Sequence, residues 1–203
     1  MKLYYSPGAC SLAPHIVARE AGLAIDLVKV DLKAHRLESG EDYYAINPRG
    51  YVPLLELDDG TRLTEVAVLT QFLADRAPQA GLIPPAGSME RVQVQMWLNY
   101  IATELHKTFS WFFNPQLPDA MRGLLNDRLA NRLSHIEKHL EGREYLMGDR
   151  FTVADAYAYT VINWTGVLKI DLTPYPNIKA YQKRVGSRPK VREALVAEGL
   201  VKS

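Results

Sequence analysis

The sequence contains one cysteine, Cys10, and its surroundings favour a reactive thiol. Residues 3–5 are typical of a strand, residues 6–9 of a turn, and a helix is predicted from Cys10 to Ala21. Backbone amides and the positive end of the macrodipole at a helix start stabilise a thiolate. A drop of two units from a reference pKa of about 8.5 raises the thiolate fraction at pH 7 from roughly 3% to roughly three-quarters. The alternative is a buried, inert side chain.

The residue three positions after the cysteine limits the reactions open to its thiol. Ala13 stands where a thioredoxin-type redox motif has its second cysteine, so a dithiol cycle within the chain is excluded. Two roles remain: a mixed disulfide with a small thiol, or a hydrogen bond that stabilises the thiolate of that partner. A lone cysteine is also typical of a reducing compartment, so the expected location is the cytoplasm.

The elements that must position Cys10 are predicted to form an α/β unit. A second strand is expected at 27–30, after a helical crossover that suits a parallel βαβ unit, and a polar stretch follows from 33 to 50. Two short strands flank Asp59 and Gly60, a pair that favours a hairpin, and Thr64 can cap the next helix. The predicted order is βαβαββα.

A dense run of helix-breaking residues divides the chain. Residues 77–87 contain three prolines and two glycines, and we predict a linker there. The α/β domain then covers 1–80, and an all-α domain covers 87–203. In the second domain, Thr152 and Asp155 have the spacing of a reciprocal cap at the start of a buried helix.

Composition limits the partners of this chain. Its 24 basic and 23 acidic residues nearly balance, so neither nucleic acid nor an anionic membrane is expected as a partner. No stretch approaches the eighteen or more apolar residues of a membrane span. A small molecule or a protein is the expected partner.

Six segments, in one order, resemble the beta class of bacterial glutathione transferases. They are 1–12 (MKLYYSPGACSL), 50–53 (GYVP), 63–65 (LTE), 97–101 (WLNYI), 104–107 (ELHK) and 151–157 (FTVADAY). The resemblance implies a thioredoxin-like first domain, an all-α second domain and a homodimer that binds glutathione near its interface. Glutathione is then a co-substrate, and neither a resident cofactor nor a metal is expected.

The resemblance also implies a set of glutathione contacts in the first domain. It implies a cis Pro53 and places the main chain of Val52 against the cysteinyl part, whereas the residues alone indicate only an edge or bulge position for the proline. Glu65 would hold the γ-glutamyl part, although an acid at a helix start is also favoured by the dipole alone. The implied contacts are Cys10, His35, Tyr51, Val52, Pro53, Glu65 and Val66.

Two of these positions depart from the family pattern. Many transferases have a hydroxyl residue where this chain has Val66, so only the backbone amide can bind there. The family commonly has a lysine at the position of His35 to hold the glycyl carboxylate, and a histidine is mostly neutral near pH 7. Arg36 or Lys33 is the alternative for that role.

A helix of the second domain would complete the site. The resemblance implies contributions across the dimer from Asn99, Thr103, Glu104, Leu105 and His106, where spacing alone indicates a solvated face with Asn99, Thr103 and His106 on neighbouring rows. His106 is expected to be catalytic with Cys10, as a hydrogen-bond donor or proton shuttle. Aromatic residues beyond it are core by default, and the candidates for an apolar second-substrate pocket are Phe109, Phe113 and Trp164.

These observations leave three functions to compare. The leading hypothesis is an enzyme that conjugates glutathione to apolar or aromatic electrophiles, with peroxide or disulfide reduction through Cys10 as related activities. A reductase of glutathionylated thiols would use Cys10 directly as the nucleophile. The third is a non-catalytic ligand carrier or interaction module of the same fold.

Overall fold

The chain forms two compact units in the computed structural model, which describes residues 1–202. The first unit contains residues 1–83 and 188–202, and the second contains Pro84–Ser187. The boundary therefore falls inside the predicted linker. The assignment of the C-terminal residues to the helical domain was wrong, because Arg188 donates to both carboxylate oxygens of Glu20, at 2.7 and 2.9 Å, and the helix after it packs in the first unit.

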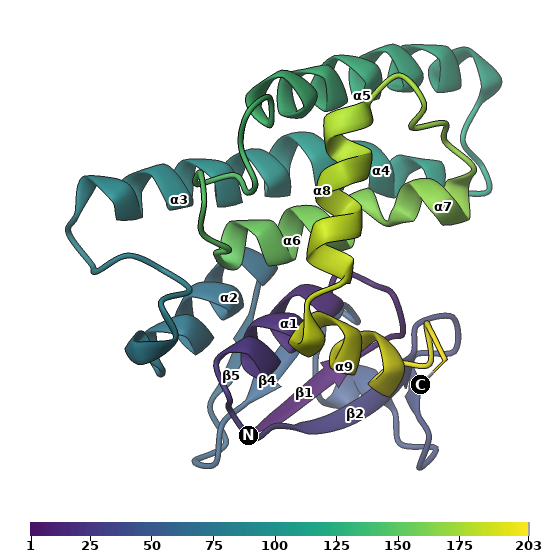
Figure 1. Cartoon of the computed structure of the whole chain (residues 1–203). Coiled ribbons are helices and arrows are strands. Elements are labelled where there is room, and N and C mark those ends of the chain that lie inside the picture. Colours follow the sequence, from purple (N-terminus) through teal and green to yellow (C-terminus); the bar gives the residue numbers. More distant parts are fainter. Residues whose placement is uncertain (203) are drawn as a thin grey trace. The chain divides into compact units, whose positions relative to one another are not determined.

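A mixed five-stranded sheet forms the centre of the first unit (Figure 1). β1 runs parallel to β2 and antiparallel to β4, and helix α1 (Leu12–Glu20) makes the crossover between the parallel pair. The thioredoxin-like fold class is thus confirmed. In spatial order the strands are β3 (Arg36–Leu37), β2 (Asp26–Asp31), β1 (Lys2–Tyr5), β4 (Leu54–Glu56) and β5 (Arg62–Thr64).

Each face of this sheet has its own core, because side chains alternate along β1. Tyr5 lies near the ring of His15 on α1, and α1 packs against α2 (Val66–Asp75) and α9 (Pro189–Ala197). On the opposite face, Tyr4 joins a buried apolar cluster. The other members of that cluster are Val30, Tyr43, Ile46, Val52 and Leu54. The second face is thus covered by the loop before β4. This loop also contains Val52, one of the predicted glutathione contacts.

The segment 33–50 departs from the predicted order. Instead of a helix it contains β3 and a short 3-10 turn, η1 (Tyr43–Ala45). The carboxylate of Asp31 accepts the amides of Lys33 and Ala34, at 2.8 and 3.0 Å, and so turns the chain directly after β2. This polar segment has no apolar stripe that a helix would bury.

The second unit is helical, as predicted (Figure 1). Helix α6 (Val153–Ile162) is buried along its whole length and packs against α3, η3 and α8. α3, η3 and α4 follow one another without a break, and η3 is a π-helical segment. The other elements are α3 (Met89–Tyr100), η3 (Ile101–His106), α4 (Lys107–Phe112), α5 (Asp119–His139), α7 (Trp164–Leu168) and α8 (Pro176–Gly186). A short 3-10 turn, η2 (Pro78–Ala80), ends the main part of the first unit.

Candidate functional site

Cys10 lies in the turn between β1 and α1, directly before the N-cap Ser11. The helix begins at Leu12, two residues later than predicted. Pro14 lies in its first turn, where a residue without a backbone N–H is tolerated because the first amides of a helix have no intrahelical acceptor. The thiol is half-buried, and its Sγ donates to the carbonyl oxygen of Val52 at 3.2 Å. Cys10 is therefore not a sealed core residue, which suits the predicted contact with a small thiol or disulfide.

The turn before Cys10 is held by residues that sequence reasoning did not identify. The amide of Gly8 donates to Oε2 of Glu198 at 2.9 Å, and Nδ1 of His15 bonds Oε1 of the same carboxylate at 2.9 Å. Nε of Arg19 lies 3.3 Å from Nε2 of His15, so the ring of His15 bridges Arg19 and Glu198. The C-terminal segment thus braces the loop that carries Cys10.

The peptide bond between Val52 and Pro53 is cis, as the resemblance implied. Pro53 lies just before β4, outside the hydrogen-bonded ladder. The Val52 side chain is buried in the apolar cluster, whereas the Tyr51 side chain is 71% exposed. Any contribution of Val52 to a ligand therefore comes from its main chain.

Glu65 occupies a strained position at the start of α2. Its φ of 71° lies in the left-handed region, which costs a residue with a side chain about 1–3 kcal/mol. Its exposed carboxylate accepts from Nη1 of Arg49 at 3.2 Å. The first amides of α2, beginning at Val66, have no acceptor within the helix, because no earlier turn supplies a carbonyl. A carboxylate and helix amides thus lie together at this end of α2.

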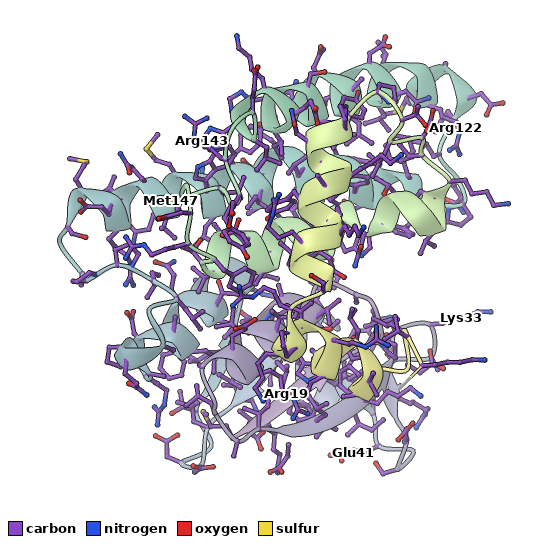
Figure 2. All side chains as sticks on the ribbon, viewed as in Figure 1. Arg19, Lys33, Glu41, Arg122, Arg143 and Met147 are labelled. Atoms are coloured by element: carbon purple, nitrogen blue, oxygen red, sulfur yellow. The ribbon has the colours of Figure 1, made fainter. Side chains whose placement is uncertain are left out.

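His35 is oriented by a stacked ring. It has a φ of 52°, and its ring stacks on Tyr44 with the centroids 4.4 Å apart. Its Nδ1 is buried against Gly50 and has no hydrogen-bond partner within residues 1–202, so only Nε2 can reach a ligand. Of the two alternatives, Arg36 donates to the Gly40 carbonyl at 2.7 Å, while Lys33 extends into solvent (Figure 2).

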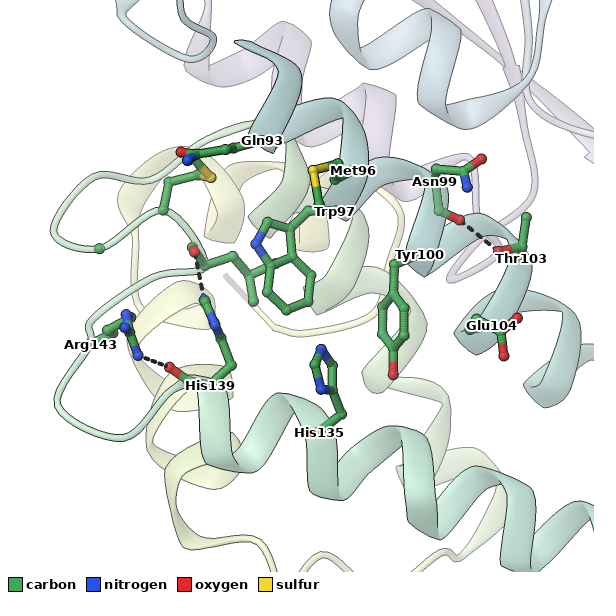
Figure 3. A pocket seen from close by; sticks show the side chains of 13 residues that line it. Gln93, Met96, Trp97, Asn99, Tyr100, Thr103, Glu104, His135, His139 and Arg143 are labelled. Carbon is green, nitrogen blue, oxygen red and sulfur yellow. Dashed lines mark hydrogen bonds between the residues drawn. The ribbon is translucent and has the colours of Figure 1, made fainter. Parts of the chain in front are cut away.

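In the helical unit, Asn99, Thr103 and Glu104 line a cavity of about 800 Å³ (Figure 3). Thr103 donates to the Asn99 carbonyl at 3.0 Å. The aromatic residues of this cavity were not predicted. Aromatic pairs spaced by three or four residues share one face of a helix, so their spacing could have indicated the cavity. These residues are Trp97 and Tyr100 on α3 and His135 and His139 on α5.

The carboxylate of Glu104 is engaged within its own unit. Its Oε2 accepts from Arg132 Nε and Nη2, at 2.9 and 2.7 Å, and from Arg128 Nη2 at 3.2 Å. The Arg132 hydrogen bonds hold the pKa of Glu104 below its usual value. The side chain of Leu105 is fully buried. Glu104 therefore joins η3 to α5, and neither side chain presents an uncommitted group to glutathione.

His106 belongs to a different environment from Asn99 and Thr103. Its Nδ1 lies 2.6 Å from the hydroxyl of Tyr157, and its ring makes an edge contact with Trp164. Burial, with a smaller effect of Lys107, lowers the pKa of His106 to about 4. His106 is therefore neutral near pH 7, which favours the predicted hydrogen-bond role over the proton shuttle.

The π-helical segment explains why the predicted row of side chains divides. In an α-helix, positions seven apart return to one face, as expected for Asn99 and His106. A π turn contains an extra residue and rotates everything after it. Asn99 and Thr103 consequently line the cavity, while His106 contacts Tyr157 on α6.

The three aromatic residues predicted for the second substrate meet at Trp164. Phe109 and Phe113 both make edge contacts with its indole, with centroids 6.2 and 5.5 Å away. Phe109 is fully buried and so supports the indole within the core, which matches the default interpretation. Phe113 is 46% exposed and can contact an apolar ligand.

Among the described residues, 1–202, no three His, Cys, Asp or Glu side chains converge as a metal site. Within the same residues, no helix is both long enough and apolar enough to cross a membrane.

Comparison with known proteins gives a consistent result. Family models described as the glutathione S-transferase N-terminal and C-terminal domains match residues 8–76 and 100–189. The chain is 47% identical to glutathione S-transferase GstA of Escherichia coli O157:H7, over 98% of this chain and 100% of that protein. A sphingomonad glutathione S-transferase solved with glutathione has a TM-score of 0.94 and 42% identity, over 99% and 100% of the two chains. The bacterial beta-class enzyme of Sphingomonas chungbukensis has a TM-score of 0.95 and 43% identity, over the same shares.

Proposed function

The chain belongs to the glutathione S-transferase family, and from this we propose that it binds glutathione with the sulfur beside Cys10. The protein is an enzyme that conjugates glutathione to electrophiles. The observation that supports the proposed sulfur position is the half-buried Cys10 thiol, next to a carbonyl and at the open end of α1. We also propose that the enzyme needs no resident cofactor, that glutathione serves as a co-substrate, and that the enzyme acts in the cytoplasm.

We propose that the first unit holds glutathione at three points. The main chain of Val52 pairs with the cysteinyl part. Glu65 and the amide of Val66 bind the γ-glutamyl part, and the strained backbone at Glu65 supports a functional reason for its placement. Nε2 of His35, or the extended Lys33, binds the glycyl carboxylate.

The γ-glutamyl anchor gives a direct test of this assignment. We expect Glu65→Gln to raise the glutathione KM by about tenfold or more with little change in kcat, because a charged hydrogen bond worth about 1.5–3 kcal/mol is lost. Steady-state kinetics measure both constants. Arg49→Gln is the matched control, since it removes the exposed ion pair but keeps the carboxylate, and should change KM less than about threefold. An unchanged KM in Glu65→Gln would leave Glu65 with a helix-dipole role only.

The helical unit is proposed to supply the electrophile site and the second set of contacts. Phe113 offers exposed apolar surface for an aromatic or aliphatic electrophile, with the buried indole of Trp164 behind it, and His106 offers a neutral imidazole for hydrogen bonding. Asn99 and Thr103, both exposed on the same helix face, are proposed to contact glutathione bound to a second copy of the chain. Glu104 and Leu105 then act by shaping that turn.

A homodimer is proposed because α3 exposes an apolar face. Met89, Val92 and Met96 are 68, 43 and 66% exposed and follow one side of the helix. We expect the double variant Val92→Asp with Met96→Asp to sediment as a 22.9 kDa species, and the parent at about twice that mass. Val167→Asp, at a similarly exposed apolar residue on α7, should remain dimeric. A parent that sediments as a fully active monomer would refute the proposal.

A further inference from the structure

Two buried side chains hold one backbone carbonyl next to the cis proline. The hydroxyl of Tyr43 donates to the carbonyl oxygen of Tyr51 at 2.8 Å, and Nδ2 of Asn47 donates to the same oxygen at 2.7 Å. Tyr43 is fully buried and Asn47 is 4% exposed. The oxygen therefore accepts two short hydrogen bonds from donors that water cannot replace.

This carbonyl belongs to the peptide plane that leads into Val52. The carbonyl of Tyr51 and the amide of Val52 are parts of one rigid unit, so fixing the first also fixes the second. The next carbonyl, that of Val52, accepts the Cys10 thiol at 3.2 Å. The two donors are thus one residue away from the acceptor of the Cys10 thiol.

Other contacts show that this loop depends on the two side chains. Asn47 also accepts the Arg49 amide on Oδ1 at 3.2 Å, and its carbonyl accepts the Gly50 amide at 2.8 Å. The side chain of Tyr51 is 71% exposed and cannot anchor the backbone by burial. Burial raises the pKa of Tyr43 to about 12, so its hydroxyl remains a donor throughout the working pH range.

We propose that Tyr43 and Asn47 are positioning residues, which hold the peptide between Tyr51 and Val52 and thereby place both the acceptor of the Cys10 thiol and the main chain that receives glutathione. The part that concerns glutathione rests on the proposed function, whereas the part that concerns the thiol does not. Neither side chain needs to touch the substrate. A purely structural role would instead contribute stability alone, without altering the thiol.

The direction of the effect on the thiol follows from the hydrogen bond. A bond from S–H to a carbonyl favours the protonated thiol, so a displaced Val52 carbonyl favours the thiolate. Local unfolding has the opposite effect, because it removes the thiol from the helix terminus that favours the thiolate, and the reactivity of Cys10 then approaches that of an ordinary cysteine. The two explanations therefore predict opposite shifts of the pH midpoint for alkylation.

The test measures alkylation of Cys10, the only cysteine, by iodoacetamide across pH, together with glutathione kinetics. For Tyr43→Phe and Asn47→Ala we expect the alkylation midpoint to fall by about half a pH unit, which is roughly a threefold gain in thiolate below the midpoint. The glutathione KM should rise about three- to tenfold with kcat within about twofold. Tyr4→Phe is the control, because it removes a hydroxyl from the same apolar cluster. The ring of Tyr4 lies 5.8 Å from that of Tyr43, and this variant should leave both the alkylation midpoint and the glutathione kinetics unchanged.

Each result has a defined meaning. Tyr43→Phe keeps the ring and so the packing, and it decides the question if Asn47→Ala does not fold. A midpoint that stays in place or rises, or the same shift in Tyr4→Phe, would overturn the positioning role. If the midpoint falls while Glu65→Gln leaves glutathione kinetics unchanged, the glutathione assignment fails and the positioning of the thiol stands.

Discussion

Replacing Cys10 by alanine is expected to separate glutathione conjugation from the disulfide exchange that is predicted for the Cys10 thiol. Disulfide exchange with a glutathionylated thiol should fall by about 100-fold or more, because the nucleophile is removed. Conjugation to an aromatic halide should stay within about tenfold of the parent, since the amides at the start of α1 can still stabilise the glutathione thiolate. Measuring both rates on the same preparations gives the comparison.

The expected chemistry of the exchange explains why the loss is selective. The Cys10 thiolate attacks the glutathione sulfur of the substrate disulfide, a Cys10–glutathione disulfide forms, and the other thiolate leaves and takes up a proton. The chain contains no second cysteine, so a second glutathione thiolate must attack this intermediate and release glutathione disulfide. Intact-mass analysis under oxidising conditions should show one glutathionyl adduct on the parent, reversed by reductant.

Two further variants make this test decisive. Cys10→Ser keeps a hydroxyl donor next to the Val52 carbonyl, so it should lose the adduct and the exchange activity but conjugate better than Cys10→Ala. On the proposed hydrogen-bond role of His106, whose imidazole is neutral near pH 7, adding His106→Ala to Cys10→Ala should reduce the remaining conjugation. Full exchange activity in Cys10→Ala would show that Cys10 only packs and that another group stabilises the thiolate.

The parts of the fold that were predicted correctly depend on local signals. The turn before Cys10, the Asp59–Gly60 hairpin and the proline-rich linker are each encoded within a few residues. The place of α9 was not predictable in this way. It packs against α1, and Arg188 just before it pairs with Glu20, 168 residues away, whereas the sequence around Arg188 is typical of an ordinary surface helix.

The site shows the same division between local and distant information. The resemblance located Cys10, the cis Pro53 and Glu65, since each lies within a short motif. The partners of the helical residues were missed, because Arg132 and Tyr157 come from other helices. The π-helical segment was missed as well, because an α-helical repeat fits its sequence equally well, and only packing against α6 reveals the extra residue.

The reciprocal cap predicted from Thr152 and Asp155 is confirmed, and it supports the largest expected effect on stability. The carboxylate of Asp155 is fully buried and accepts the amides of Leu146 and Thr152, both at 2.8 Å, and the hydroxyls of Thr152 and Tyr181, at 2.9 and 3.1 Å. Asp155→Ala leaves these donors buried without an acceptor, which we expect to cost about 3 kcal/mol or more. Urea unfolding at pH 7 measures this loss, and the melting temperature should fall by roughly 6–12 °C. Asp149→Ala, at an exposed loop position, should stay within about 0.5 kcal/mol of the parent.

The loss in Asp155→Ala is also expected to depend on pH. Burial raises the pKa of Asp155 to about 6, although the hydrogen bonds from Leu146, Thr152 and Tyr181 act in the opposite direction. Because this folded-state pKa lies above the unfolded value of about 3.9, the folded protein takes up a proton that the unfolded chain does not as pH falls from about 6 to 4. The parent therefore gains stability relative to the variant over this range, by up to about 3 kcal/mol. Unfolding at pH 4.5 and 7 compares the two, and an equal difference at both values would mean that the hydrogen bonds outweigh burial and keep Asp155 ionised.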